Sequence, residues 1–363
     1  MYKSLYSLLL VVLLSSCAKE IEKDIEPQQA SSIFEKYKSG VVLIVSQYYY
    51  EIDADGHTFY YCPTSDDKIL FTKEDAINNL SMSTGTGFII SENGEIITNN
   101  HVVNHKDEDY KIFVVDLYEN LKSGIFQQIT QYNDTIQNIQ SEYYSYSEYM
   151  HEIEKETHKR NYLRALEEKS NLVDMFRQLE NTDLSKLNSK LVIHHLGIAY
   201  NDTHVTQVDD LQECVVIKTS EDPKVDLAMI QTKTKTFNIA PKAIFNFKDN
   251  NPNIAANPEK HSERDIKNPV KINEDVYMIG FNKGFVIAST KQGIKSQFTS
   301  GKISQENDGE RLLYTIPTLE GSSGSPIVDK WGNLVGVNFA KITNSQNFSF
   351  GVPVDAVKKF YEE

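Results

Sequence analysis

The stretch Gly321-Ser322-Ser323-Gly324-Ser325-Pro326 joins two apolar runs, residues 311–317 and 327–338, that have the length and composition of β-strands. Glycines on both sides of a serine allow a sharp turn that leaves the hydroxyl uncovered. Such a turn can also direct successive backbone N–H groups toward one point, where they would stabilise a negative charge developing on an oxygen. A plain Gly/Ser-rich hairpin turn has the same composition. The stretch therefore needs partners elsewhere in the chain.

Two further motifs supply these partners. Gly85-Thr86-Gly87-Phe88-Ile89-Ile90 leads through the turn signal Asn93-Gly94 to Ile97-Thr98-Asn99-Asn100-His101-Val102-Val103. Much later, Asp226 stands directly before the apolar run 227–230. An imidazole, a carboxylate and a hydroxyl are the three groups that nucleophilic catalysis by serine requires.

Together the three motifs resemble those of the trypsin-like serine proteases, most closely the HtrA/Deg-type bacterial branch, over about residues 39–359. The order His, Asp, Ser along the chain is also that of chymotrypsin. The resemblance implies a mostly β fold of two six-stranded antiparallel β-barrels and serine endopeptidase activity. It assigns His101 as the base, Asp226 as the acid that orients it and Ser323 as the nucleophile. The N–H groups of Gly321 and Ser323 would form the oxyanion hole.

The nucleophile turn departs from the family pattern at two positions. Ser322 replaces the asparagine before the serine, and Ser325 replaces the second glycine after it. Both replacements are small and neither position supplies a reacting group, so we expect activity. Ser322 competes with Ser323 for the role of nucleophile, and Gly324 on the far side favours Ser323. Asp209-Asp210 is a rival for the acid, but no apolar strand follows it directly.

The resemblance also indicates where a substrate binds. Residues 332–338 resemble the hairpin whose second strand pairs with a substrate backbone. The residues expected to bind substrate are Thr318, Leu319, Val337, Asn338 and Phe339. Because residues 316–319 contain no acid, we expect a small or medium apolar residue before the cleaved bond, not Lys or Arg.

The predicted organisation places an N-terminal barrel lobe at residues 39–235 and a C-terminal lobe with a terminal helix at residues 236–363. Strands are expected at residues 40–45, 88–90, 95–98, 110–117, 191–200, 213–219, 227–230, 275–281, 284–288 and 299–304, besides the two runs that flank the nucleophile turn. A short helix is expected within the Tyr-rich insert 47–83, whose tyrosines we expect to cover a strand pair. The loop around residues 246–268 is polar.

A long helical hairpin is predicted to interrupt the first barrel at about residues 119–188. From Ile125 the apolar positions advance by alternating steps of four and three, which is the spacing of a coiled-coil seam. These positions are Ile125, Ile129, Tyr132, Ile136, Ile139, Tyr143, Tyr146, Met150 and Ile153. A self-packed spur, contact within a homo-oligomer, substrate recruitment and a gate over the cleft all remain open as roles. The usual family pattern has no such insertion.

Composition limits the class of protein. The 363 residues carry a net charge of −14 and are 40% hydrophobic, which supports a packed core and argues against nucleic acid as a partner. Of the three cysteines, Cys62 and Cys214 could pair or remain separate thiols. His101 and His105 have a zinc-like spacing, but Val102 replaces the glutamate of that motif. No metal site and no cofactor are therefore predicted.

The N-terminus reads as a targeting segment. Lys3 and the apolar run 8–14 precede Leu14-Ser15-Ser16-Cys17, which resembles a bacterial lipobox. This interpretation predicts a lipoprotein signal peptide at residues 1–16, lipidation of Cys17 and a tether at residues 17–38. By family rules Ala18 favours the outer membrane. An ordinary secretory signal is the alternative. The family's peptide-binding PDZ domain is not expected after residue 363.

Two functional hypotheses follow. The first is a lipid-anchored endopeptidase that cleaves envelope or extracellular proteins through an acyl-enzyme. The second is a catalytically silent binding or sensor lipoprotein of the same fold that holds a partner with the helical insertion. An esterase of the α/β-hydrolase type is excluded, because that fold has the order Ser, Asp, His and alternates strands with helices.

Overall fold

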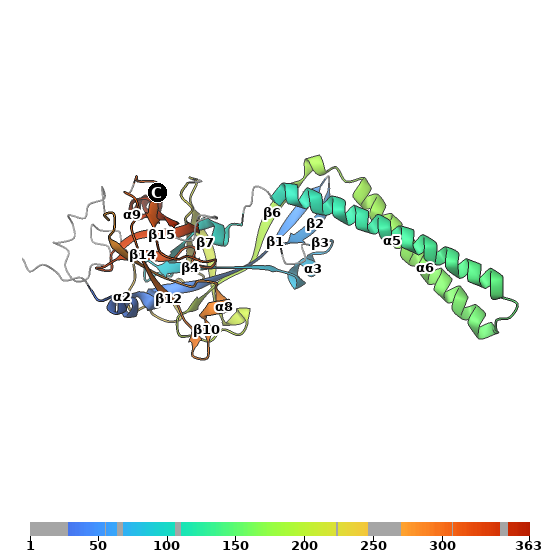
Figure 1. Cartoon of the computed structure of the whole chain (residues 1–363), viewed down its shortest axis with the longest axis horizontal. Helices are drawn as coiled ribbons and strands as arrows, with labels where there is room; N and C mark the ends of the chain where they lie inside the picture. Colours follow the sequence, from blue (N-terminus) through green and yellow to red (C-terminus); the bar gives the residue numbers. More distant parts are fainter. Residues whose placement is uncertain are drawn as a thin grey trace, which may run out of the picture.

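The computed structural model describes residues 28–54, 56–63, 68–105, 110–222, 224–245, 270–306, 308–341 and 348–363. Two curved antiparallel sheets lie side by side at one end of the molecule, and a long two-helix arm projects from the other end (Figure 1). The predicted signal peptide and Cys17 lie outside the described residues, as does the polar loop 246–268.

The first sheet contains a closed barrel. Its strands run in the order β1 (Val41–Ala54), β4 (Ser81–Ile89), β5 (Glu95–Thr98), β8 (Ala228–Thr232), β7 (Gln212–Thr219) and β6 (Asn188–Tyr200). Pairing of β1 with β6, from Val42 opposite Tyr200, closes the ring. The predicted hairpin at Asn93-Gly94 is confirmed, since β4 pairs with β5 and Gly94 has a φ of 80°. Six antiparallel strands around one core are what the motif resemblance predicted.

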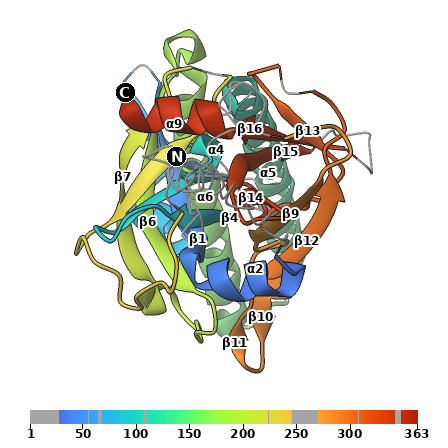
Figure 2. The same cartoon turned by 90° about the vertical axis from the view of Figure 1, so that its left-hand side faces the viewer.

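The second sheet also has six strands, in the order β12 (Gln297–Lys302), β9 (Asp275–Gly280), β14 (Pro326–Asp329), β15 (Leu334–Lys341), β16 (Ser349–Pro353) and β13 (Leu312–Tyr314). It is less completely closed than the first, because its outer strands meet only through the bridge between Ile303 and Tyr314. Figure 2 shows it beside β6 and β7 of the first sheet, with the arm seen end-on behind. The predicted trypsin-like fold class is confirmed.

One expected strand of this lobe is wrong. Residues 284–288 form the short helix α8 (Phe285–Ala288), and the small ribbon of β10 (Ser289–Thr290) and β11 (Gly293–Ile294) follows. Gly284 has a φ of 48°, which breaks an extended chain before the apolar residues. Val286 and Ile287 are exposed on the helix, so the apolar composition of this segment did not reflect burial in a sheet.

The predicted tether is too long at its C-terminal end. Ala30–Tyr37 forms α2, which continues into the 3-10 turn η1 (Lys38–Gly40). Ile33 and Tyr37 are fully buried in the core cluster that joins the two sheets. Burying such a side chain contributes roughly 1.5–3 kcal/mol, so α2 is part of the folded domain. At the other end of the chain, the predicted terminal helix is α9 (Val354–Glu362), which buries Val357 and Phe360.

A β-ribbon extends from the closed barrel toward the arm. The distal half of β1 pairs with β2 (His57–Cys62) on one side and with the distal half of β6 on the other. The strand β3 (Lys68–Leu70) and the helix α3 (Lys73–Asn78) complete this layer. Tyr49, Tyr50 and Tyr61 are almost completely buried on the ribbon. The expectation that these tyrosines cover a strand pair is confirmed.

The arm consists of α5 (Tyr110–Tyr146) and α6 (Glu152–Glu180), followed by the 3-10 turn η2 (Leu184–Lys186). The predicted strand at residues 110–117 is therefore wrong, and the helices begin before the predicted boundary of 119. Val114, Tyr118 and Leu179 pack against Ile52 and Phe59 of the ribbon. This contact with the ribbon favours a helix, even though the β-branched run is typical of a strand.

Both cysteines with a described position are buried free thiols. Cys62 lies on β2 and Cys214 on β7, and no disulfide joins them. Burial raises the pKa of the Cys62 thiol to about 11 and that of the Cys214 thiol to about 12.

None of the helices that the structure describes is long and apolar enough to cross a membrane.

The buried thiols should be nearly inert in the folded protein. At pH 8 a pKa of about 11 leaves roughly one thiol in a thousand ionised. In a Cys17→Ser chain we expect Cys62 and Cys214 to react with an aromatic disulfide reagent more than about a hundredfold faster after unfolding in guanidinium than before it. Rapid labelling of either thiol in the folded chain would contradict the burial described here.

Candidate active site

His101 and Asp226 form a close pair at the rim of the first barrel. His101 lies on the short helix α4 (Asn100–Val103), directly after β5, and Asp226 lies in the turn before β8. His101 Nδ1 lies 2.5 Å from Asp226 Oδ2, and the backbone N–H of His101 donates to Oδ1 at 3.0 Å. Both carboxylate oxygens therefore hold the histidine. The His101 side chain is 50% exposed and that of Asp226 is 20% exposed.

Neighbouring residues support this pair. The amide of Asn99 donates to the carbonyl oxygen of Asp226 at 2.6 Å, which fixes the turn that carries the acid. His105 stacks on Tyr48 with ring centroids 3.8 Å apart. Burial, and to a smaller extent the nearby His101, lower the pKa of His105 to about 4. The His105 ring is therefore neutral near neutral pH and adds no charge beside His101.

Asp210, one of the two alternative acids, has a structural role. Asp209 and Asp210 lie in the 3-10 turn η3 (Val208–Asp210). The Asp210 carboxylate accepts hydrogen bonds from the backbone N–H groups of Thr206 and Gln207, and these bonds lower its pKa. Asp210 therefore caps this turn, and its carboxylate is already occupied there.

The nucleophile turn requires glycine at two positions. Gly321 has a φ of 89° and Gly324 a φ of 84°, in the left-handed region that side chains disfavour. A Cβ at Gly321 would clash with Phe281 and Gly284, and one at Gly324 would clash with Thr86 and Thr98. The turn is thus pressed against β4 and β5 of the first barrel, and β5 leads directly to His101.

Thr86 joins the two barrels at this turn. Its backbone N–H donates to Ser323 O at 2.8 Å, and its hydroxyl donates to Gly321 O at 2.9 Å. The same hydroxyl accepts from Phe281 N–H of the second barrel at 2.9 Å. Thr98 Oγ1 donates to Thr86 O at 2.7 Å. One fully buried residue of β4 therefore positions both ends of the segment Gly321–Ser323.

The two departures from the family pattern are accommodated. Ser322 is buried and donates to Leu319 O at 2.5 Å, while the amide of Asn338 donates to Ser322 O at 2.9 Å. Ser325 is also buried, and its hydroxyl occupies the space that a Cβ at Gly280 would need. Ser322 is committed to the turn, whereas the neighbouring Ser323 is only half-buried.

Two backbone donors at the turn are unused. Within the described part of the chain, the N–H groups of Gly321 and Ser323 have no hydrogen-bond acceptor. The Ser323 hydroxyl likewise has no partner there, so no hydrogen bond to His101 is formed. Catalytic hydrogen bonds are often long or absent before substrate binds. The structure thus places Ser323 on a turn that packs against the first barrel, which carries His101, but the hydrogen bond between Ser323 and His101 is not formed.

The expected substrate-binding residues fall into two groups. Val337 is fully buried in the core, and Asn338 uses its side chain to hold the nucleophile turn and to accept a hydrogen bond from the Tyr314 hydroxyl at 2.6 Å. The side chains of Val337 and Asn338 are therefore engaged within the protein, and the expected pairing of their strand with a substrate backbone stays a prediction. Thr318 is also buried and bonds Ser349 at 2.8 Å. Leu319 and Phe339 remain accessible.

The sequence interpretation missed the positioning residues. The sequence predicts no separate role for Thr86 within the Gly85-Thr86-Gly87 motif, and it predicts that Asn338 binds substrate. A buried hydroxyl between two glycines on a strand was the available signal, since buried polar groups require partners. Among the residues with described positions, no group of three His, Cys, Asp or Glu side chains could hold a metal ion.

A family-model match covers part of the chain. Residues 195–337 match the model of the trypsin-like peptidase domain. This part of the chain is similar to trypsin-like peptidases. The trypsin-like match contains Asp226 and Ser323 and begins after the arm, so His101 lies outside it.

Among solved structures, the serine endoprotease from Yersinia pestis is 13% identical, with a TM-score of 0.44, and the match covers 93% of this chain and 67% of that one. No curated protein sequence matches. The family-model match over residues 195–337 supports a peptidase, that is, a hydrolase of peptide bonds.

The Thr86 hydroxyl should influence the reaction more than substrate binding. Thr86→Val keeps the shape and the backbone N–H but leaves Gly321 O and Phe281 N–H without a partner. Each buried unsatisfied group costs about 1–3 kcal/mol, which would displace the oxyanion donors. We expect kcat for peptide cleavage to fall at least about tenfold with KM nearly unchanged. Thr86→Ser, which retains the hydroxyl, should keep most of the activity. Equal kcat values for the Val and Ser variants would contradict this role.

Proposed function

We propose that this protein is a serine endopeptidase with His101, Asp226 and Ser323 as its catalytic triad. The observation that carries the proposal is the His101–Asp226 pair, with both carboxylate oxygens on one histidine. It lies next to a turn in which the N–H groups of Gly321 and Ser323 have no acceptor among the residues with described positions. An oriented base and preorganised donors are the two components that make a serine hydroxyl reactive toward a peptide carbonyl.

The reaction would proceed in two stages. Ser323 Oγ attacks the carbonyl carbon while His101 Nε2 accepts the hydroxyl proton, and Asp226 stabilises the imidazolium. The N–H groups of Gly321 and Ser323 hold the oxyanion. The C–N bond then breaks as His101 returns the proton to the leaving amine. A water attacks the acyl-enzyme by the same route, with its proton passing to His101 and then to Ser323 Oγ.

The natural setting is a further part of the proposal. A chain anchored by a lipid on Cys17, at the outer membrane of a bacterial envelope, would act on envelope or extracellular proteins. The lipobox-like Leu14-Ser15-Ser16-Cys17 supports this setting. The accessible Leu319 and Phe339 flank the nucleophile turn and would contact the substrate.

A catalytically silent binding or sensor protein is the second candidate. The missing hydrogen bond between Ser323 and His101 favours it, because a relaxed triad does not activate the serine. In this case the arm would hold the partner, and the barrels would serve as a scaffold.

A fluorophosphonate probe distinguishes the two candidates. The proposal predicts covalent labelling of the purified chain and complete loss of labelling in Ser323→Ala. Ser322→Ala is the matched control and should still be labelled, because Ser322 only braces the turn. Asp226→Asn should lower kcat by about 10⁴-fold, the loss known for this substitution in a Ser-His-Asp triad. Absence of labelling, both alone and with unfolded protein substrates present, would favour the silent scaffold.

Cleavage of a peptide library tests the specificity. Glu320 is the acid nearest the expected pocket wall, but its side chain is 84% exposed and lies 3.3 Å from Lys283 Nζ. It is therefore not available to bind a basic side chain inside the pocket. We expect small or medium apolar residues before the cleaved bond. A preference for Lys or Arg would show that another acid forms the pocket.

A further inference from the structure

The segment that follows His101 is held by side chains of β1. His105 lies two residues beyond the end of α4, and its backbone carbonyl accepts a hydrogen bond from the Tyr50 hydroxyl. The His105 ring stacks on Tyr48 with centroids 3.8 Å apart, and His105 Nε2 lies 3.4 Å from Ser46 Oγ. The three β1 residues are spaced by two along the strand, as expected for side chains that share one face.

This contact lies where β1 leaves the closed barrel. Along β1, pairing with β4 ends at Tyr48, and pairing with β2 begins at Tyr50. The register between β1 and β6 also shifts at this point, between Gln47 and Tyr48. His105 is therefore held at the boundary between the barrel that carries His101 and the ribbon that carries the arm.

The same tyrosines belong to the base of the arm. Tyr50 is 4% exposed and is a member of the apolar cluster that joins the ribbon to the arm, and Tyr48 packs against that cluster. From the arm, Val114 and Tyr118 of α5 and Leu179 of α6 enter it. Tyr50 thus takes part in the arm cluster and also donates its hydroxyl to the segment that follows α4.

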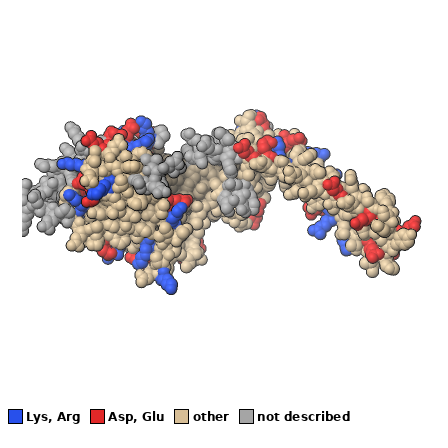
Figure 3. Space-filling model, viewed as in Figure 1, with Lys and Arg blue, Asp and Glu red and all other residues tan. Residues whose placement is uncertain are grey.

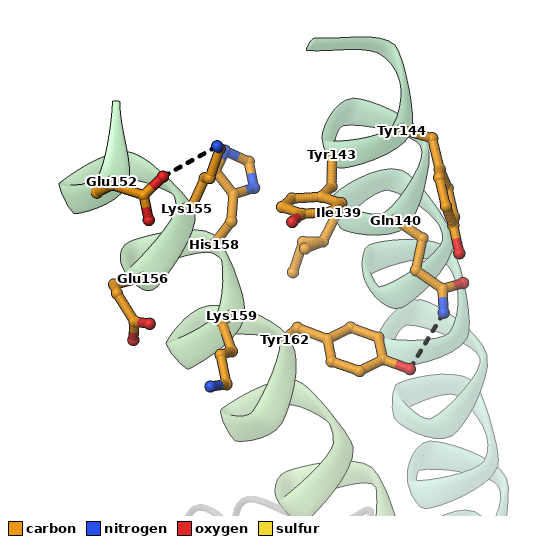
Figure 4. Close-up of a pocket in the computed structure, with 10 residues that line it drawn as sticks. All are labelled: Ile139, Gln140, Tyr143, Tyr144, Glu152, Lys155, Glu156, His158, Lys159 and Tyr162. Atoms are coloured by element: carbon orange, nitrogen blue, oxygen red, sulfur yellow. Dashed lines mark hydrogen bonds and ion pairs between the residues drawn. The ribbon is translucent and has the colours of Figure 1, made fainter. Parts of the chain in front are cut away.

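The arm is packed at its base and open toward its tip. Ile125, nearer the base, is 5% exposed, whereas Ile153 near the tip is 82% exposed. A groove of about 500 Å³ lies between the two helices near the tip, with Ile139 and Tyr143 pointing into it (Figure 4). Figure 3 shows the arm extending away from the barrels. A movement of the arm would therefore reach β1 through the packed base.

We propose that Tyr50 and His105 are positioning residues for His101, and that they tie the helix that carries it to the base of the arm. This role rests on the endopeptidase function proposed for the chain. The four-residue α4 is too short to keep its shape alone, so it depends on its anchors. Asp226 holds its first turn through the His101 N–H, and His105 holds the segment after its last residue. A displacement of the arm base would then move His101.

Removal of one hydroxyl tests the tie. Tyr50→Phe keeps the ring in the arm cluster but loses the hydrogen bond to His105 O. We expect kcat for peptide cleavage to fall about three- to tenfold, the effect of one hydrogen bond, with KM nearly unchanged. Tyr49→Phe is the matched control, because the neighbouring Tyr49 packs in a separate cluster, and it should change neither constant. His105→Ala should lower kcat similarly, and His105→Phe, which restores a ring against Tyr48, should recover part of the loss.

A second pair of variants tests the link to the arm. Val114→Ala opens space in the cluster at the arm base, and we expect it to lower kcat at least about twofold. The double variant Val114→Ala with Tyr50→Phe should lose less than the product of the two single losses, because both weaken the same restraint on His101. Ile153→Ser, at the exposed tip, is the control and should leave kcat unchanged. Fully multiplicative losses would contradict a link through Tyr50.

Amide hydrogen exchange tests the tie without relying on catalysis. In the full chain, solubilised in a nonionic detergent, Tyr50→Phe should accelerate exchange in residues 99–105 at least about threefold, and Tyr49→Phe should not. If the unmodified chain fails to react with a fluorophosphonate, the endopeptidase function is wrong, and exchange alone then decides whether the tie exists. Unchanged exchange in Tyr50→Phe would overturn the tie. In an active chain, an unchanged kcat, or an equal loss in Tyr49→Phe, would overturn the positioning role.

Discussion

The side-chain hydroxyl of Thr86 is the contact on which the active-site arrangement depends. It donates to Gly321 O in the turn of the second barrel and accepts from the N–H of Phe281 in the same barrel. The backbone N–H of Thr86 also donates to Ser323 O. The two sheets share one apolar core cluster, but apolar packing is not directional. Hydrogen bonds from a fully buried threonine are directional, so they set the position of the nucleophile turn relative to β5 and His101.

The long strands β1 and β6 explain how the molecule combines two different surfaces. Their proximal halves close the barrel, and their distal halves form the ribbon on which the arm stands. Each end has its own apolar cluster. The proposed catalytic groups therefore lie on the barrel that the proximal halves close, and the exposed helical surface lies beyond the distal halves.

Short motifs predicted the barrels well, because the steric demands of a tight turn are visible in the sequence. Gly94, Gly321 and Gly324 all have positive φ values, and each occurs in a motif that could be recognised. The strand predicted at residues 110–117 is wrong because a β-branched run is compatible with a strand or a helix until its packing partner is known. Here that partner is the ribbon, which the sequence does not place beside it.

The site was only partly predictable for a related reason. His101, Asp226 and Ser323 stand in recognisable patterns, but the support from Thr86, Asn99 and Asn338 depends on contacts between distant segments. Asn338 reaches Ser322 within the second lobe, and Thr86 reaches Gly321 where the two lobes meet. The end of the tether was missed similarly, because Ile33 and Tyr37 reveal their role only through the core that they enter.

The position of the arm in the chain bears on how the protein folds. His101 and Asp226 are separated by 125 residues, and a loop of that length must close before they meet. At the base of the arm the Tyr118 hydroxyl donates to Leu179 O, which joins residues 61 apart in sequence. A locally folded helix pair thus removes about half of the loop, and halving a flexible loop lowers its closure entropy cost by only about 0.6 kcal/mol. An insertion of this kind is consequently a small thermodynamic burden, and fast helix formation would let it assemble ahead of the barrel that surrounds it.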